Sequence, residues 1–369
     1  MSARRSGSSF QLARSMNGRK QSRERHVLIT GGAGFVGCNL ANRIARSGER
    51  VLLFDNLSRA GVEQNVAWLR EQHPESVHLL VGDVRDLHAL EEAVQHASAV
   101  FHLAAQVAVT TSLSSPIHDF EVNARGTLNL LESLRALRNP PPLIFTSTNK
   151  VYGCLRDVPL ALRADRYEPA RREHARGISE TQPLEFYSPY GCSKGAADQY
   201  VLDYAQTYGL PAVVLRMSCI YGPHQFGTED QGWVAHFLIQ ALNGRPITIY
   251  GDGKQVRDIL YIEDLLDAFA LARENVASIT GRAFNIGGGS DNTTSLLELV
   301  KIIGQLNGAP RVKSGSWRPG DQRYYVSDFS SFAHATGWRP KVSLRDGIAR
   351  LQDWLLETQR ESPAKLATA

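Results

Sequence analysis

Short apolar runs alternate with longer stretches of mixed character along most of this chain. The apolar runs cover residues 27–30, 50–54, 77–81, 99–103, 143–145, 211–216 and 283–287. Their length, and their boundaries at glycine, proline or aspartate, are typical of strands buried on both faces. Between the runs apolar positions recur at helical spacing, as at Leu40, Ile44 and Ala45, which predicts amphipathic helices. This alternation predicts an α/β fold with a doubly wound parallel sheet.

We expect the doubly wound domain to span residues 26–216. Residues 154–187 interrupt its rhythm with several prolines and many charged residues, which predicts an inserted loop. Residues 217–357 are expected to form a smaller, mostly α-helical region that binds the substrate. Its strands near 258–262 and 283–287 are expected to return to the central sheet. Residues 1–25 and 358–369 are expected to be tails, the first of them basic and disordered.

Composition narrows the class of protein. The chain has 369 residues, of which 43% are hydrophobic and 21% charged, and no apolar run is long enough to span a membrane. The net charge is +4, but residues 1–25 alone carry +6, so the remainder carries −2. The body therefore has no basic surplus that would indicate nucleic-acid binding. The four cysteines form no pair or cluster with metal-ligand spacing, which favours reduced thiols in the cytoplasm and no metal site.

A glycine-rich turn follows the first apolar run. Gly31, Gly34 and Gly37 lie between a predicted strand and a predicted helix, and Asp55 ends the next strand. Such glycines allow a tight turn and close approach of a pyrophosphate, while the helix N-terminus supplies free N–H groups. The acid is placed to bind the adenosine ribose, and its negative charge would repel a 2′-phosphate. The pattern therefore predicts NAD binding, with a purely structural glycine turn as the alternative.

Tyr190 and Lys194 are the residues for which we predict chemistry. If the run Ser188-Pro189-Tyr190-Gly191-Cys192-Ser193-Lys194 opens a helix, the two side chains share one face. A neighbouring ammonium favours the phenolate, so Lys194 is expected to lower the Tyr190 pKa. The spacing alone is weak evidence, because many solvated helices contain it. Cys192 is expected to be a packed small residue, since no nearby histidine would activate its thiol.

Other polar positions follow the ends of predicted strands. In a doubly wound sheet, ligands bind beyond the carboxyl ends of the strands. Asp83, Ala104-Ala105 and the run 146–148 all fall there. His102 occupies a strand end as well, and we expect it to be a core histidine and not a base.

In the glycine turn, in the run from Ser188 to Lys194 and in several other segments, the chain strongly resembles the extended short-chain dehydrogenase/reductase family. The segments GGAGFVG, HLAAQ, TSTNKVYG, SPYGCSK, YGP, GDGKQVRDILYIED and RPGD occur in the family's order between Val27 and about Leu356. The resemblance implies a Rossmann sheet and tightly held NAD. It also implies a nucleotide-sugar substrate and a homodimer or homotetramer. Members are epimerases, dehydratases and reductases.

Matching motif positions imply the following site. Thr148, Tyr190 and Lys194 correspond to the catalytic triad. The cofactor contacts implied are Gly31, Gly34, Phe35, Val36, Gly37, Asp55, Asn56, Asp83, Val84, Leu103, Ala104, Ala105, Asn123, Thr146, Tyr190 and Lys194. The substrate contacts implied are Gln106, Thr148, Asn149, Lys150, Ser218, Cys219, Gln225, Arg257, Arg318 and Asp321. Arg257 and Arg318 match arginines that bind the substrate diphosphate, a role that suits a planar guanidinium.

Two departures from the family narrow the activity. Dehydratases of the family carry an Asp-Glu pair where Asn149-Lys150 stands, so elimination of water is not expected. Many 4-epimerases have an asparagine where Cys219 stands, and a thiol bonds phosphate poorly. The runs around Thr148, Ser188 and Gln225 resemble a branch that epimerises CDP-linked 3,6-dideoxyhexoses at C2. A UDP-hexose 4-epimerase or other sugar-nucleotide epimerase, an NAD(P)H-dependent ketosugar reductase and a non-enzymatic NAD-binding regulator remain alternatives.

Overall fold

A seven-stranded parallel sheet forms the centre of the protein. The computed structural model describes residues 24–318 and 320–361. The strands of this sheet run in the order β12-β8-β5-β4-β1-β2-β3, and all neighbouring pairs are parallel. They comprise β1 (His26–Thr30), β2 (Val51–Asp55), β3 (Val77–Val81), β4 (Ala97–His102), β5 (Leu143–Thr148), β8 (Ala212–Met217) and β12 (Ala283–Ile286). The predicted doubly wound sheet is confirmed, and its order reverses between β1 and β4.

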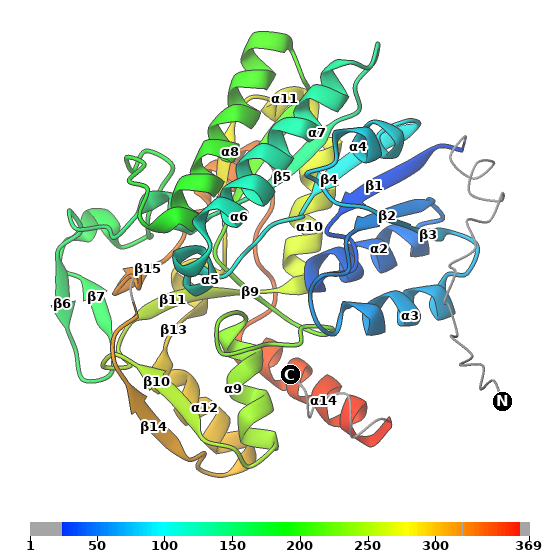
Figure 1. The fold of residues 1–369 in the computed structure, drawn as a ribbon. Helices are drawn as coiled ribbons and strands as arrows, with labels where there is room; N and C mark the ends of the chain where they lie inside the picture. Colours follow the sequence, from blue (N-terminus) through cyan, green and yellow to red (C-terminus); the bar gives the residue numbers. More distant parts are fainter. Residues whose placement is uncertain (1–23, 319, 362–369) are drawn as a thin grey trace, which may run out of the picture.

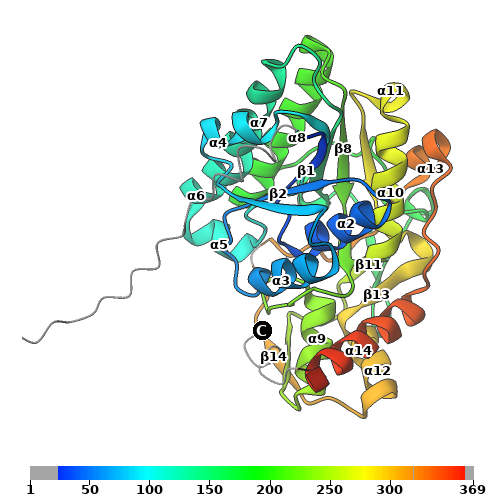
Figure 2. The ribbon, with the colours of Figure 1, turned by 90° about the vertical axis from the view of Figure 1, so that its right-hand side faces the viewer.

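Helices cover both faces of the sheet (Figures 1 and 2). One face packs against α2 (Phe35–Arg46), α3 (Val62–Gln72) and α10 (Ile262–Glu274), and the other against α4 (Leu87–Ala93), α7 (Gly126–Arg135) and α8 (Ser188–Tyr208). Each face of the sheet therefore has its own cluster of buried apolar side chains. Alternate strand residues point to opposite faces, so Val27 and Ile29 belong to the first cluster, with α2, α3 and α10, and Leu28 belongs to the second. The strands read as uninterrupted apolar runs because both faces are buried.

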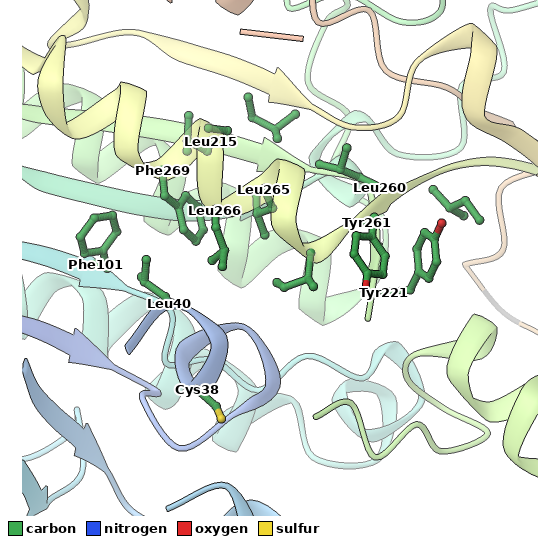
Figure 3. Close-up of a cluster of buried hydrophobic side chains, with 14 of the residues drawn as sticks. Cys38, Leu40, Phe101, Leu215, Tyr221, Leu260, Tyr261, Leu265, Leu266 and Phe269 are labelled. Carbon is green, nitrogen blue, oxygen red and sulfur yellow. The ribbon is translucent and has the colours of Figure 1, made fainter. Parts of the chain in front are cut away.

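Figure 3 shows the first of these two clusters. Leu40 of α2 and Phe101 of β4 meet Leu265 and Phe269 of α10, with the Phe101 and Phe269 ring centroids 5.6 Å apart. Each such side chain contributes about 1.5–3 kcal/mol on full burial. The same cluster extends to Tyr221, so it joins the central sheet to the region that follows it.

The region after Met217 contains two small sheets as well as helices. One pairs β10 (Ile247–Tyr250) with β14 (Val312–Gly315), and the other joins β11 (Val256–Tyr261) to β13 (Thr293–Ser295), β15 (Tyr324–Tyr325) and β9 (Cys219–Tyr221). Its helices are α9 (Trp233–Leu242), α11 (Val276–Ile279), α12 (Leu296–Asn307), α13 (Ser330–Thr336) and α14 (Leu344–Glu361), with the short turn η4 (Ser290–Asn292).

This arrangement confirms one expectation for the region and corrects another. Helix is more extensive than strand, as expected. β12 returns to the central sheet, but β11 does not, because β12 ends that sheet and β11 pairs with β9, β13 and β15 instead. A buried apolar run predicts a strand without identifying its partner. Strands as short as β13 and β15 were not predicted, because they carry little periodic signal.

The inserted segment 154–187 contains a short antiparallel pair, β6 (Leu160–Leu162) with β7 (Tyr167–Pro169), and the turn η3 (Arg172–His174). Near the site lie α5 (Val109–Ser114), α6 (Pro116–Phe120), η1 (Glu121–Arg125) and η2 (Asn149–Tyr152). The prediction for residues 1–25 falls almost wholly outside the described residues, and α14 extends beyond the expected tail boundary at 358. Over the described ranges, we find no helix with the length and apolar character needed to cross a bilayer.

Candidate active site

A cavity of about 620 Å³ lies beyond the carboxyl ends of the central strands. Every predicted substrate contact lines it: Gln106, Thr148, Asn149, Lys150, Ser218, Cys219, Gln225, Arg257, Arg318 and Asp321. The predicted cofactor contacts that line it are Gly31, Gly34, Phe35, Val36, Gly37, Asp55, Asn56, Val84, Leu103, Ala104, Ala105, Thr146, Tyr190 and Lys194. The fold thus brings together residues from both parts of the chain, and their individual roles stay predictions.

The glycine turn leaves room for a dinucleotide. Gly31 has φ +68°, and a Cβ there would lie 2.7 Å from the backbone nitrogen of Ala104. A Cβ on Gly37 would lie 2.4 Å from the Gly31 carbonyl oxygen. The N-cap of α2 is Gly34, and no side chain caps this helix end. The residues present therefore fit NAD, whose pyrophosphate would meet the free N–H groups at the start of α2.

Two aspartates near this turn differ in their surroundings. The Asp55 carboxylate accepts hydrogen bonds from Ala33 N (3.0 Å) and Leu57 N (2.9 Å), while burial raises its pKa. Asp83 does not line the cavity, although its neighbours Gly82 and Val84 do. Its carboxylate is held by Arg85 at 2.8 Å and by Asn56 at 2.9 Å, and the Arg85 hydrogen bond keeps the Asp83 pKa well below its usual range.

The three predicted catalytic residues meet at the cavity floor. Thr148 ends β5, and its side chain is hydrogen-bonded to Tyr190. Tyr190 and Lys194 lie on the first turns of α8 and are both buried. Lys194 Nζ donates to the Thr146 carbonyl at 2.7 Å and sits 4.3 Å from the Phe145 ring centroid. A hydroxyl, a phenol and an ammonium thus face one reaction space.

The expected effect of Lys194 on Tyr190 is not found. Burial raises the pKa of Tyr190 to about 12, although the Thr148 hydrogen bond opposes this shift. Burial also lowers the pKa of Lys194 to about 8, against the raising effect of Asp198 and Asp119. Desolvation therefore determines the direction of both pKa shifts.

A buried polar network that the sequence did not reveal stands behind Tyr190. Asp119 accepts hydrogen bonds from Ser193 Oγ and from Asn123 Nδ2, the latter at 3.3 Å. Asn123 also bonds both backbone groups of Gln106, at 2.9 Å and 3.0 Å. Asn123 therefore lies behind the cavity wall and positions Gln106, so the structure does not show it as a direct cofactor contact.

Three basic side chains line the cavity beside the acidic Glu229, Asp230 and Asp321, and Arg318 is ion-paired with Asp230 at 3.6 Å. Lys150 Nζ donates to the Gly320 carbonyl at 3.2 Å, and burial followed by nearby Arg257 lowers the Lys150 pKa to about 8. Arg257 donates to two backbone carbonyls, those of Val256 and Gln322. Arg318 lies 3.7 Å from the Tyr250 ring centroid. Three basic groups beside one cavity suit an anionic ligand such as a diphosphate.

Two predicted lining residues have polar partners: Ser218 Oγ donates to the Asp258 carbonyl at 2.9 Å, and Cys219 accepts a hydrogen bond from Trp233 Nε1 at 3.4 Å. Polar atoms that are buried without a partner also occur on the lining, a sign of groups built to meet a ligand. They belong to Thr110, Ser147, Gln225, His236 and Gln255. Of these, only Gln225 was predicted as a substrate contact. Ser147 and Gln255 stand inside the recognisable motifs but were not predicted as contacts, and Thr110 and His236 stand outside them.

Two other expectations have clear outcomes. Cys192 is exposed, so the prediction of a packed residue is wrong. The turn of α8 at Tyr190 and Ser193 faces inward, which directs Cys192 outward.

His102 is a core histidine as expected: it is bonded to Thr30 at 2.6 Å and Thr127 at 3.1 Å. Burial lowers its pKa to about 3.

The parallel sheet, the glycine turn and the Thr148–Tyr190–Lys194 cluster define an NAD-binding enzyme of the short-chain dehydrogenase type. The chain belongs to the NAD dependent epimerase/dehydratase family, whose model matches residues 27–287. The family and the cofactor predicted from the sequence are therefore confirmed.

Particular relatives extend over nearly the whole chain. CDP-paratose 2-epimerase from Salmonella typhi is 45% identical, covering 89% of this chain and 98% of its own length. A dTDP-glucose 4,6-dehydratase from Xanthomonas campestris is 32% identical, with 90% and 93% covered. The structure of Thermus thermophilus UDP-glucose 4-epimerase in complex with NAD has a TM-score of 0.74 and 34% identity, covering 90% of this chain and 99% of that one.

Proposed function

We propose that this protein is an NAD-dependent nucleotide-sugar epimerase that inverts C2 of a CDP-linked 3,6-dideoxyhexose, interconverting CDP-paratose and CDP-tyvelose. The observation that carries the proposal is the 45% identity to CDP-paratose 2-epimerase over 98% of that relative. The presence of Thr148, Tyr190, Lys194 and three basic side chains on the lining of one cavity supports it.

The side chains support a reversible oxidation. Tyr190, once ionised, removes the proton from the sugar hydroxyl at the reacting carbon, and later returns it. Thr148, bonded to Tyr190, donates a hydrogen bond to the same oxygen. NAD, which the glycine turn and Asp55 would hold, would supply the hydride acceptor and donor that this oxidation and its reversal require. Acid–base help of this kind contributes about 10²–10⁴ in rate.

The relatives also include dehydratases, but neither Asn149 nor Lys150, at the two positions where dehydratases of the family carry acids, has a carboxyl group. Asn149 hydrogen-bonds Gln322 at 3.4 Å and cannot donate a proton as an acid. Lys150 is a cation below about pH 8 and points to anion binding. The second candidate is a UDP-hexose 4-epimerase, which the likeness to the Thermus thermophilus enzyme favours.

The test is to incubate the protein with CDP-paratose, CDP-tyvelose and UDP-hexoses and to identify the products by NMR. We expect epimerisation at C2 of the CDP-sugars, no net NADH, and no solvent deuterium at the epimerised carbon. Tyr190→Phe should abolish turnover and retain NAD. Turnover of UDP-hexoses alone would favour the second candidate, and stoichiometric consumption of NAD(P)H a reductase. NAD binding without any turnover would favour a regulator.

We also infer a cytoplasmic homodimer or homotetramer. Apolar Ile117 and Phe120 on α6, beside α8, have 78% and 53% of their surface exposed, which is typical of a face that a partner covers. Light scattering of the purified protein tests the assembly, and a monomeric mass at micromolar concentration would contradict it. Cell fractionation tests the location.

A further inference from the structure

Asp119 on α6 is a carboxylate with no solvent exposure. Its two oxygens accept hydrogen bonds from Ser193 Oγ and Asn123 Nδ2. Among the described residues no lysine, arginine or histidine forms an ion pair with it. Burying an unpaired charge is costly, and burial raises the Asp119 pKa, while the Ser193 and Asn123 hydrogen bonds and the Lys194 charge oppose that shift.

Lys194 is a buried cation that directly follows Ser193, the residue whose hydroxyl is bonded to Asp119. Its side chain is 3% exposed. Its ammonium bonds the Thr146 carbonyl and lies over the Phe145 ring, and no carboxylate within 24–318 or 320–361 approaches it at ion-pair distance. Asp119 is thus hydrogen-bonded to the residue that precedes Lys194, and neither charged group has an ion-pair partner among the described residues.

The other charged or titratable groups around Lys194 are already accounted for. Asp198, one turn along α8, is held by Arg216 through two hydrogen bonds of 2.9 Å each. His102 on β4 is neutral near pH 7, because burial and the Lys194 charge lower its pKa. His118 neighbours Asp119 on α6, and Tyr190 is uncharged in the ligand-free protein. The anion left to balance Lys194 is Asp119.

We propose that Asp119 is a positioning residue: through Ser193 it fixes the first turn of α8, and its charge compensates Lys194 beside Tyr190. This assignment goes beyond the proposed epimerisation and rests on it only for the activity measurement described last. An anion in this place raises the pKa of both Lys194 and Tyr190. It therefore keeps the lysine cationic to higher pH, while making the phenol harder to ionise.

The first test measures folding and needs no substrate. Asp119→Asn, Lys194→Met and the double variant are unfolded with urea. If the two charges compensate each other, each single change leaves one buried charge unbalanced. The loss of unfolding free energy in the double variant should then be smaller than the sum of the losses in the two single variants. Additive effects would overturn the proposal.

A second measurement covers the case in which Asp119→Asn does not fold. In Lys194→Met labelled with ¹³C-aspartate, Asp119 loses its counter-charge and should take up a proton. The infrared spectrum at pH 7 should then show one more protonated aspartate than the wild-type spectrum. An unchanged spectrum would overturn the proposal.

The third test uses the pH dependence of turnover. Removing the anion lowers the pKa of both Tyr190 and Lys194, so the whole pH–kcat profile of Asp119→Asn should move toward acid. A purely structural role would lower kcat at every pH without moving the profile, which would contradict the compensating charge. Glu121→Gln is the matched control: Glu121 lies on the next segment, is paired with Arg125, and should leave the profile unchanged. If no sugar nucleotide is turned over, the proposed function fails while the first two tests still decide the role of Asp119.

Discussion

Removal of Arg216 tests how much the buried ion pair behind the active site contributes to stability. The side chains of Arg216 and Asp198 are 5% and 0% exposed. The guanidinium bonds both carboxylate oxygens at 2.9 Å and the Tyr152 hydroxyl at 3.1 Å. Arg216→Met leaves Asp198 as an uncompensated charge in a site without solvent. Breaking a buried pair in this way costs about 3–5 kcal/mol, and we expect that loss in the free energy of unfolding.

Urea unfolding followed by circular dichroism measures this loss. Replacing both partners, as in Arg216→Met with Asp198→Leu, should recover most of it, because the isolated charge is then gone. The control is Arg135→Met: Arg135 and Glu132 form a pair that is 47% and 38% exposed, so its loss should leave the urea midpoint almost unchanged. A loss of under 1 kcal/mol for Arg216→Met would refute the reasoning.

Three further predictions concern the cavity and the thiols. Gly37→Ala places a Cβ 2.4 Å from the Gly31 carbonyl oxygen and should weaken NAD binding at least tenfold, or by about 1.4 kcal/mol. In contrast, Gly304→Ala, where the nearest atom is 3.5 Å away, should leave NAD affinity unchanged by calorimetry. Lys150 loses its charge as pH rises through about 8, so KM for the nucleotide sugar should rise above that pH in the wild type and stay level in Lys150→Met. Cys192 is exposed, while Cys38 is buried with a raised pKa, so a maleimide should label Cys192 and spare Cys38, as peptide mapping would show.

The sequence predicts the central sheet well because its strands are long and buried on both faces. The predicted runs 143–145 and 211–216 fall on β5 and β8, since each is a continuous apolar run with clear boundaries. The partner of β11 could not be read in this way. Pairing depends on which edge is free in the folded molecule, and β9, β13 and β15 supply that edge from distant parts of the chain.

The same distinction applies to the site. Residues inside motifs, such as Gly37 and Tyr190, could be placed from the sequence because one segment supplies both the residue and its context. Asp119 could not, since its partners Ser193 and Asn123 come from other segments. Cys192 was misplaced because a residue next to a catalytic tyrosine can face either way until the helix is docked.

The raised pKa of Tyr190 decides how much stabilisation its phenolate needs before it can act as a base. A phenol with a pKa near 12 must gain about 7 kcal/mol of phenolate stabilisation to act as a base near pH 7, at 1.36 kcal/mol for each pKa unit. Burial creates this deficit, and the Thr148 hydrogen bond offsets only part of it. Lys194 is a cation below about pH 8 but is not among the causes of the Tyr190 shift. The charge of Asp119 acts on both residues in the same direction, since it raises the pKa of Lys194 and of Tyr190. Asp119 therefore keeps the lysine cationic to higher pH and at the same time makes the phenol harder to ionise.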